Sequence, residues 1–326
     1  PEYFLDKICE NVRLLKVNRK GVFDPRALRR LKSFISDNGI THVVAMNMYP
    51  MLYSFLAAKS LGTGIRVMAS INTTSFGNVK DALQMVIYVP ILFMLDKVIF
   101  GCHSQMELWV RRYFIPRKKS TVIYNGVDTS LYSVASAQAE IENVRMNIDV
   151  DGELVIGTVA RLMDEKGHRH SFECMKKLRD EGIKLKFIIV GDGPLRSDYE
   201  RLVTDLGIMR SVVFAGNHTD VRGYLGIMDI FILSSVAVET FSNALLEAMS
   251  MGRPVIATDI SGASEMIRDG KNGLLVTPGD VEGLAAAIKS LLDKDARSAL
   301  SASARNRVVN EFSVERMIED YELLLI

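Results

Sequence analysis

The sequence contains little cysteine, little tryptophan and almost no excess of charge of one sign. Its 326 residues include only Cys9, Cys102 and Cys174, and the formal net charge is +1. Three widely spaced cysteines exclude a disulfide framework and a cysteine-rich zinc site, so we expect a reducing, cytosolic compartment. An apolar fraction of 48% excludes intrinsic disorder as the main state. The length predicts a globular protein with one large domain or two to three ordinary ones.

Long hydrophobic runs are also missing. The longest, from Met85 to Leu95, has eleven residues and contains Pro90. A helix that spans a bilayer needs about 20 apolar residues, so no transmembrane segment is expected. The length of this run favours a buried core helix over a membrane contact.

Charge is divided unevenly along the chain. Residues 1–132 contain 18 Lys and Arg against 9 Asp and Glu, whereas residues 133–326 contain 22 against 30. This asymmetry suggests two domains with different partners. A phospholipid leaflet is one anionic surface that the basic half could approach, although an ordinary solvated face explains the same composition. We expect no nucleic-acid partner.

Short apolar runs alternate with helical patterns along most of the chain. Near-continuous apolar strands are typical of a parallel sheet covered on both faces. The expected strands are His42–Met46, Ile65–Ser70, Val98–Gly101, Thr121–Tyr124, Leu154–Val159, Leu185–Val190, Val212–Ala215, Ile230–Leu233, Pro254–Ala257 and Leu274–Val276. The pattern predicts an α/β protein with two Rossmann-like doubly wound domains.

The predicted boundaries follow the same pattern. We expect domains at residues 1–132 and 133–312, joined through a polar stretch without a strong pattern at 133–152. A capped amphipathic helix is expected from Ser313 to the end of the chain.

The most informative segment follows the expected strand Ile230–Leu233. A helix starting near Ser242 and ending at Gly252 would leave the backbone N–H groups of Thr240, Phe241, Ser242 and Asn243 facing an anion. Glu239 precedes this helix and Glu247 lies within it, so their carboxylates could stand roughly 7–10 Å apart along one ligand. A solvated surface helix with two unremarkable glutamates is the plainer interpretation.

Two further loops fall at the same sheet edge. Arg161 and Lys166 follow the strand Leu154–Val159, and together they could neutralise a diphosphate. Gly191 and Gly193 follow the next strand and predict a tight turn that lines a nucleotide site. This turn lacks the third glycine of the dinucleotide fingerprint and has Arg196 there, which disfavours an NAD-dependent dehydrogenase.

Metal-binding patterns are weak. The short D-x-D pattern occurs twice, at Asp149–Asp151 and at Asp293–Asp295, and neither copy follows a convincing strand. His168 and His170 are spaced so that they do not share one helix face. We therefore predict no metal site.

The order of the motifs resembles glycosyltransferase family 4. The segments that carry the resemblance are V-I-Y-N-G-V-D (122–128), G-T-V-A-R-L…E-K-G (157–167), V-G-D-G-P (190–194), E-T-F-S-N-A-L-L-E-A-M (239–249), G-R-P-V-I-A-T-D (252–259) and N-G-L-L-V (272–276). The resemblance implies the GT-B architecture, in which two Rossmann-like domains face each other across a cleft. It also implies a nucleotide-sugar donor on the C-terminal domain, a last helix (313–326) that crosses back to the N-terminal domain, and no catalytic metal.

The resemblance also implies roles for individual residues. Glu239 would contact the donor sugar and serve catalysis, and Glu247 would hold the ribose hydroxyls. Arg161 and Lys166 would bind the diphosphate, with the turn Thr240–Asn243 beside it. Two features depart from the family pattern. Residues 1–41 supply no first strand with its glycine-rich loop, which indicates that roughly 40–60 residues are missing. Asn72 stands where many members have histidine.

The leading hypothesis is a cytoplasmic, retaining hexosyltransferase, peripheral on the inner face of the membrane. It would move a sugar from a UDP- or GDP-sugar to a saccharide or lipid-linked acceptor in cell-surface polysaccharide or lipopolysaccharide synthesis. The alternatives are a nucleotide-sugar epimerase or hydrolase on the same scaffold and a noncatalytic partner that binds a sugar nucleotide. The base, sugar, acceptor and linkage depend on pocket shape, which motifs do not record.

Overall fold

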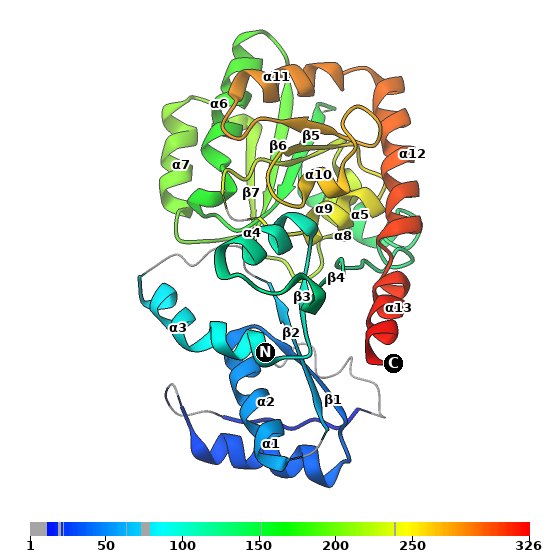
Figure 1. Ribbon diagram of the computed structural model, residues 1–326. Helices are drawn as coiled ribbons and strands as arrows, with labels where there is room; N and C mark the ends of the chain where they lie inside the picture. Colours follow the sequence, from blue (N-terminus) through cyan, green and yellow to red (C-terminus); the bar gives the residue numbers. More distant parts are fainter. Residues whose placement is uncertain are drawn as a thin grey trace. The chain divides into compact units, whose positions relative to one another are not determined.

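The computed structural model of the chain describes residues 12–18, 21, 23–62, 64–72, 79–150, 152–237 and 239–326, with side chains omitted at 79–83. The chain divides into two compact units (Figure 1). The first comprises Pro1–Asn72, Phe76–Ile99 and Val110–Thr121, and the second comprises Thr73–Ser75, Phe100–Trp109 and Val122–Ile326. The domain limits expected at residues 132 and 312 remain predictions.

The first unit contributes most of a four-stranded sheet in the order β1-β2-β3-β4. The strands alternate with helices in the chain order α1 (Pro25–Asp37), β1 (His42–Met46), α2 (Met48–Leu61), β2 (Arg66–Ile71), α3 (Val79–Met94), β3 (Lys97–Phe100), α4 (His103–Tyr113), the short helix η2 (Arg117–Lys119) and β4 (Ser120–Val122). All four strands expected here are confirmed to within about two residues at either end. β1 and β2 are parallel, with His42 opposite Arg66.

The second unit contains a six-stranded sheet in the order β10-β9-β8-β5-β6-β7. Its strands are β5 (Leu154–Val159), β6 (Leu185–Val190), β7 (Val212–Gly216), β8 (Ile230–Leu233), β9 (Val255–Thr258) and β10 (Leu274–Val276), all paired in parallel. The predicted doubly wound sheet is confirmed. After β7 the chain crosses to place β8 on the other side of β5, so the strand order reverses between β5 and β8. Ligands of open α/β sheets bind at such a switch point, outside the carboxyl ends of the strands.

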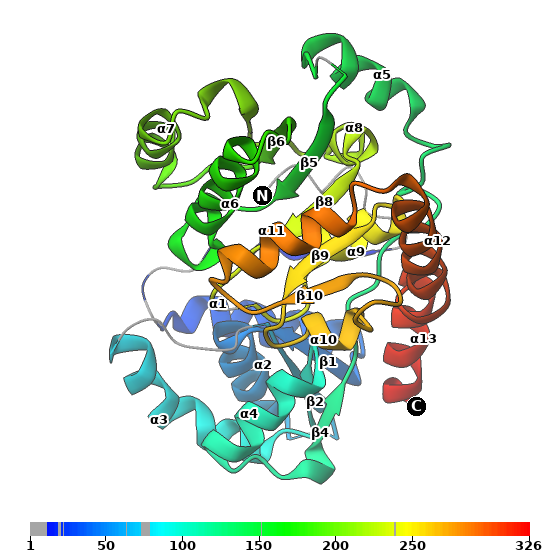
Figure 2. The same ribbon diagram turned by 90° about the horizontal axis from the view of Figure 1, so that it is seen from above.

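Helices cover both faces of this sheet (Figure 2). On one face, α6 (His168–Asp180), α7 (Arg196–Asp205) and α11 (Val281–Ser290) pack on the strands around Phe172 and Phe187. On the other face, α5 (Gln138–Asn147), α8 (Arg222–Ile227), α9 (Asn243–Ser250) and α12 (Lys294–Glu311) enclose Phe231. Neighbouring residues of one strand serve opposite cores, for example Ile188 and Ile189, because successive side chains alternate between faces. The remaining elements are η3 (Asp164–Lys166), η4 (Met209–Ser211), α10 (Ala263–Met266) and α13 (Val314–Leu325).

The stretch 133–152, which shows no strong pattern in the sequence, contains α5. Ile141 and Val144 are buried on one side of this helix and face α8. Gly226 of α8 lies so close to Ile141 that a Cβ atom at Gly226 would overlap it. Sequence analysis missed this helix, because two buried apolar residues about one turn apart form too short a pattern to indicate a helix. The domain boundary near this stretch remains a prediction.

The C-terminal helix is confirmed as a capped helix. The Ser313 side chain accepts from the Arg316 N–H at 3.3 Å. Val127 holds the start of α13, because its N–H donates to the Phe312 carbonyl at 3.0 Å and its own carbonyl accepts from the Val314 N–H at 3.0 Å. Its return to the N-terminal domain remains a prediction.

Candidate functional site

Lys166 and Glu239 meet at the switch point of the second sheet. Lys166 ends the loop after β5 and Glu239 lies in the loop after β8, and the Lys166 Nζ is 2.8 Å from the Glu239 Oε2. Their side chains are 21% and 10% exposed. The strand order therefore brings together two predicted site residues that are 73 positions apart in the sequence.

Two serine hydroxyls also hold these loops, one by a bond within the loop after β8 and one by a bond between the two loops. The Ser235 hydroxyl donates to Glu239 Oε2 at 2.8 Å, and the Ser234 hydroxyl donates to the Lys166 carbonyl at 3.0 Å. Gly167 follows Lys166 with φ +66, and a Cβ atom there would overlap the Ser234 carbonyl oxygen. Only glycine allows this approach, so the fixed position of the ion pair depends on it.

Arg161 lies in the same loop as Lys166 but is exposed. Its guanidinium has no hydrogen bond or ion pair with the residues that the structure describes. Its carbonyl is 3.0 Å from His168 Nε2, and His168 is 1% exposed. Burial lowers the pKa of His168, so the ring is neutral and its Nε2 carries the proton donated to Arg161. The bond from His168 fixes the backbone of Arg161, and the exposed Arg161 guanidinium remains available to an anionic ligand.

Gly191 and Gly193 form a turn that packs on this loop. A Cβ at Gly191 would overlap the Ala160 carbonyl, and one at Gly193 would overlap the Leu162 carbonyl. The Leu162 N–H donates to the Asp192 carbonyl at 3.1 Å. The two glycines therefore hold the backbone on either side of Arg161, whereas their predicted contact with a nucleotide remains a prediction.

Helix α9 begins close to where the sequence predicted. Ser242 is its N-cap and accepts from the Leu245 N–H at 3.4 Å. The preceding turn is fixed from two sides: the Thr240 carbonyl accepts from the Gly262 N–H at 3.0 Å, and the Asn125 side-chain amide donates to Asn243 Oδ1 at 2.9 Å. The first N–H groups of such a helix are suited to an anion.

Phe241 occupies a different place from its neighbours in this turn. It is 3% exposed, and its ring stacks on Tyr124 at 4.8 Å and contacts the edge of Phe312 at 5.3 Å. Its side chain therefore anchors the turn in the core. Only the backbone of Phe241, and not its ring, therefore remains to line the predicted donor site.

Glu247 lies on α9 in a largely apolar environment. Burial raises the pKa of Glu247 to about 7, although a hydrogen bond from the Tyr132 hydroxyl opposes the shift and the nearby Asp220 carboxylate adds to it. Asp220 is itself paired with Arg222 at 2.5 Å. A carboxyl group with this pKa changes its charge near neutral pH, which makes its environment unusual for a glutamate.

Sequence reasoning missed four residues that hold the site together: Asn125, Tyr132, His168 and Ser235. Asn125 belongs to the segment V-I-Y-N-G-V-D (122–128), which lies within the first domain expected from the sequence (1–132). The structure places Asn125 in the second unit, where its side-chain amide donates to Asn243 at the start of α9. The other three belong to no motif: Tyr132 acts on Glu247 from a distant part of the sequence, and Ser235 and His168 act within irregular loops.

No group of three or more His, Cys, Asp and Glu suited to a metal ion occurs in the part of the chain that the structure describes. Asp293 caps α12 by accepting from the Ala296 N–H at 2.8 Å. Asp151 lies outside the described residues. No described helix is long and apolar enough to cross a membrane.

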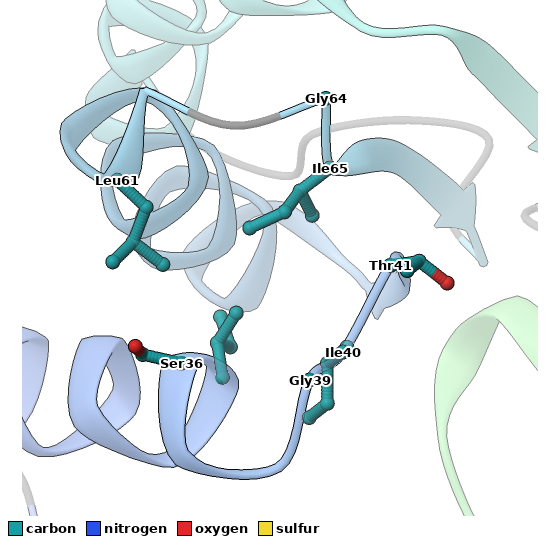
Figure 3. A pocket seen from close by; sticks show the side chains of 8 residues that line it. Ser36, Gly39, Ile40, Thr41, Leu61, Gly64 and Ile65 are labelled. Carbon is teal, nitrogen blue, oxygen red and sulfur yellow. The ribbon is translucent and has the colours of Figure 1, made fainter.

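In the first unit, Asn47 and Asn72 follow β1 and β2 at the carboxyl edge of the sheet. The Asn47 side chain accepts from the Asn72 N–H at 3.4 Å. A hollow of about 320 Å³ lies at the opposite edge, between the ends of α1 and α2 (Figure 3). It is lined by Ile35, Ser36, Gly39, Ile40, Thr41, Leu61, Gly64 and Ile65, which form no cluster of titratable groups.

Two family models match the chain in succession. Residues 8–131 match the glycosyltransferase family 4 model, and residues 153–294 match the model for glycosyl transferases group 1. The chain belongs to the family-4 glycosyltransferases, and its two parallel sheets are those of the GT-B fold.

Individual relatives are more distant. The chain is 33% identical to the lipopolysaccharide core biosynthesis glycosyltransferase LpsE of Rhizobium meliloti, over 57% of this chain and 53% of that protein. It is 23% identical to the Escherichia coli UDP-Gal:α-D-GlcNAc-diphosphoundecaprenol α-1,3-galactosyltransferase, over 99% of this chain and 83% of that protein. Its fold is similar to that of Anabaena HepE in complex with UDP, with a TM-score of 0.83 and 20% identity over 92% of this chain and 82% of that one. The chain spans about half the length of the first curated relatives that it matches.

Proposed function

We propose that this protein is a retaining glycosyltransferase that moves a sugar from a UDP-sugar to a lipid-linked saccharide in the synthesis of a cell-surface glycan. The observation that carries the proposal is the meeting of Lys166 and Glu239 beside exposed Arg161 and the N-terminus of α9, at the switch point of the second sheet. Cations and helix N–H groups suit a diphosphate, and a carboxylate suits sugar hydroxyls.

The donor class follows from the same groups together with the relatives. Arg161 and Lys166 would bind the diphosphate, Glu239 would accept from a sugar hydroxyl, and Glu247 would accept from the ribose. UDP is the nucleotide in the HepE complex and the donor nucleotide named for the Escherichia coli relative, so we favour UDP over GDP. A lipid-linked acceptor is supported by that relative's diphosphoundecaprenol substrate.

The proposed reaction balances without a further reagent. The bond between the anomeric carbon and the β-phosphate oxygen breaks, and its electron pair leaves with the diphosphate. The acceptor hydroxyl oxygen bonds to the anomeric carbon on the same face, and its proton passes to the departing phosphate oxygen. Arg161 and Lys166 would stabilise the charge that develops on the leaving group, which is where preorganised cations contribute most to the rate. The residues of this chain would carry out these steps with no metal ion assigned to them.

Calorimetric titration with UDP, GDP, ADP and NAD tests the donor site. We expect UDP to bind, and Arg161→Ala to weaken its affinity about tenfold, or about 1.4 kcal/mol. Arg201→Ala is the matched control, because Arg201 is also an exposed arginine of the second unit but pairs with Asp198 on α7. No binding of any nucleoside diphosphate by the folded protein would contradict the proposal and favour a noncatalytic role.

Product analysis separates transfer from the chemistry of the alternatives. With a UDP-hexose and a detergent-dispersed diphospholipid saccharide, mass spectrometry should find UDP and an acceptor enlarged by one hexose. An altered sugar nucleotide without acceptor would indicate an epimerase, and free hexose would indicate a hydrolase.

A further inference from the structure

Tyr132 lies along one face of α9, far from its own place in the sequence. The Tyr132 carbonyl accepts from the Ser250 hydroxyl at 2.8 Å, across 118 positions of the chain. The Tyr132 hydroxyl donates to the side chain of Glu247, which precedes Ser250 by three positions and therefore shares its helix face. A single residue thus contacts α9 at two points, one with its backbone and one with its side chain.

The backbone of Tyr132 is fixed from several sides. The Arg305 guanidinium of α12 donates to the Tyr132 carbonyl at 3.2 Å and also to the Ser250 carbonyl. The Tyr132 N–H donates to the Asp128 carbonyl at 2.9 Å, and the Tyr132 ring packs against the core of the second unit. A side chain on an anchored backbone can hold its partner in one orientation. The Tyr132 hydroxyl is therefore suited to fix the position of Glu247.

The charged groups around Glu247 do not replace this bond. Asp220, in the loop after β7, lies close enough to oppose a charge on Glu247. Arg222 of α8 could offset this effect, but it pairs with Asp220 at 2.5 Å and with Glu140 of α5 at 2.6 Å. Within the part of the chain that the structure describes, the Tyr132 hydroxyl is thus the group that favours a charged Glu247 against burial and against Asp220.

The Tyr132 hydroxyl remains a hydrogen-bond donor at neutral and alkaline pH, because burial and the charge of Glu247 raise the pKa of Tyr132. A hydrogen bond to a charged carboxylate is stronger than one between neutral groups, so the hydroxyl stabilises the ionised form of Glu247. Burial nevertheless raises the pKa of Glu247 to about 7. Without the hydroxyl, the pKa of Glu247 would be higher still, and the carboxyl group would be mostly protonated at neutral pH.

We propose that Tyr132 is a positioning residue for nucleotide binding: its hydroxyl holds the Glu247 side chain in place, in the charged form that accepts hydrogen bonds from ribose hydroxyls. The inference rests on the proposed function, because it needs a nucleoside diphosphate at the switch point of the second sheet. A charged carboxylate is a stronger acceptor for hydroxyl protons than a carboxylic acid. Nucleotide affinity should therefore rise with pH as Glu247 ionises, and Tyr132 should set the pH at which this rise occurs.

Tyr132→Phe tests the control of Glu247 without any ligand. The variant keeps the ring and loses only the hydroxyl, which should make Glu247 about a tenfold weaker acid in the folded protein. Because the pKa of Glu247 is then raised further above its unfolded value, the variant should lose more stability than the parent as the pH rises from 5 to 9. Urea unfolding measures this difference. In a Glu247→Gln background, the effect of Tyr132→Phe should be the same at every pH.

UDP titration of the parent and of Tyr132→Phe at two pH values tests the role in binding. Comparison of the two proteins at each pH cancels the ionisation of UDP itself. We expect the variant to bind UDP about eightfold more weakly at pH 6.5 and less than about twofold more weakly at pH 9, where Glu247 is charged in both proteins. Tyr199→Phe is the matched control, because Tyr199 is a buried tyrosine of the second unit whose hydroxyl donates to the neutral Met163 carbonyl at 3.3 Å. Its effects on stability and affinity should not depend on pH.

The outcomes separate this inference from the proposed function. A difference in unfolding between the parent and Tyr132→Phe that does not change with pH would mean that the hydroxyl only packs, and would overturn the inference. An equal loss of UDP affinity at pH 6.5 and pH 9 would also overturn it, while the binding of UDP would leave the proposed function standing. No UDP binding to the parent at either pH would reject the proposed function and the binding role of Tyr132 together. The urea series would in that case still report whether Tyr132 controls the ionisation of Glu247.

Discussion

The two units differ in how they treat apolar surface. The second unit buries both faces of its sheet, through one core around Phe172 and Phe187 and another around Phe231, and offers polar loops at the sheet edge. The first unit places several exposed apolar side chains on one helix, α3, among them Val86 and Ile87, although the second unit also exposes apolar side chains such as Met146. A closed core with fixed loops is suited to a small, charged ligand, because the loops hold charges in place. An apolar face left open is suited to a partner of large area.

Gly167→Ala should have the largest effect on stability, and it tests whether the loops of the second unit are held in a fixed position. Its Cβ would overlap the Ser234 carbonyl while φ is +66, so we expect a loss of about 4 kcal/mol in the free energy of unfolding. Gly62→Ala is the control in the first unit, where φ is +63 and nothing lies within 4 Å. It should lose only about 1–2 kcal/mol, the cost of the left-handed conformation. Equal losses in urea denaturation would mean that the loop contact at Gly167 is adjustable.

Glu247→Gln should stabilise the protein at alkaline pH. Burial raises the pKa of Glu247 to about 7, above its ordinary value of 4.5, so the fold favours the protonated acid. The parent therefore loses stability as the pH rises from 4.5 through 7, and Gln, which resembles the neutral acid, does not. We expect the variant to exceed the parent by about 1–3 kcal/mol at pH 8 and to match it at pH 4.5.

The same variant should weaken UDP binding, which would show that the site retains a destabilising charge for its function. Glu322→Gln, at an exposed position of α13, is the control and should not change the pH dependence. A pH-independent difference between Glu247→Gln and the parent would mean that Glu247 ionises as an ordinary surface glutamate.

The Lys166–Glu239 pair should give the smallest effect on stability. A double-mutant cycle with Lys166→Met and Glu239→Gln should yield a coupling of about 1 kcal/mol in unfolding, because both groups remain partly solvated. Glu239→Gln should impair turnover more than UDP affinity, since its partner would be the sugar. A coupling near zero would mean that the two side chains do not interact in solution.

Elements made of local patterns were predictable. β5, β6, β8 and β10 have the bounds expected from the sequence, because a continuous apolar run limited by polar or glycine residues identifies a buried strand by itself. α9 was predictable for a similar reason, since Ser242 is a good N-cap ahead of an apolar stretch. Helix α5 was not, because its apolar face is short and its burial depends on glycines in α8.

The site was predictable as a set of residues but not as a set of contacts. Arg161, Lys166, Glu239 and Glu247 were expected together from motif order. Their partners Ser235, Tyr132 and His168 were not. Tyr132 meets Glu247 only through the tertiary structure, whereas Ser235 and His168 bond within their own loops, whose irregular backbone leaves no periodic pattern. Phe241 was grouped with the donor residues, yet its ring packs on Tyr124.

The sequence by itself determined the strands, the order of the charged loops and the membership of the family, because hydrophobic periodicity and motif spacing are properties of neighbouring residues. Only the tertiary structure decided that Lys166 pairs with Glu239, that Glu247 is buried enough to shift its pKa, and that the apolar residues of α3 remain exposed. For the ion pair, the physical reason is the crossing from β7 to β8, which places β8 beside β5. Distances across a sheet and the burial of a side chain are set by which strands become neighbours, and no local segment of the chain contains that information.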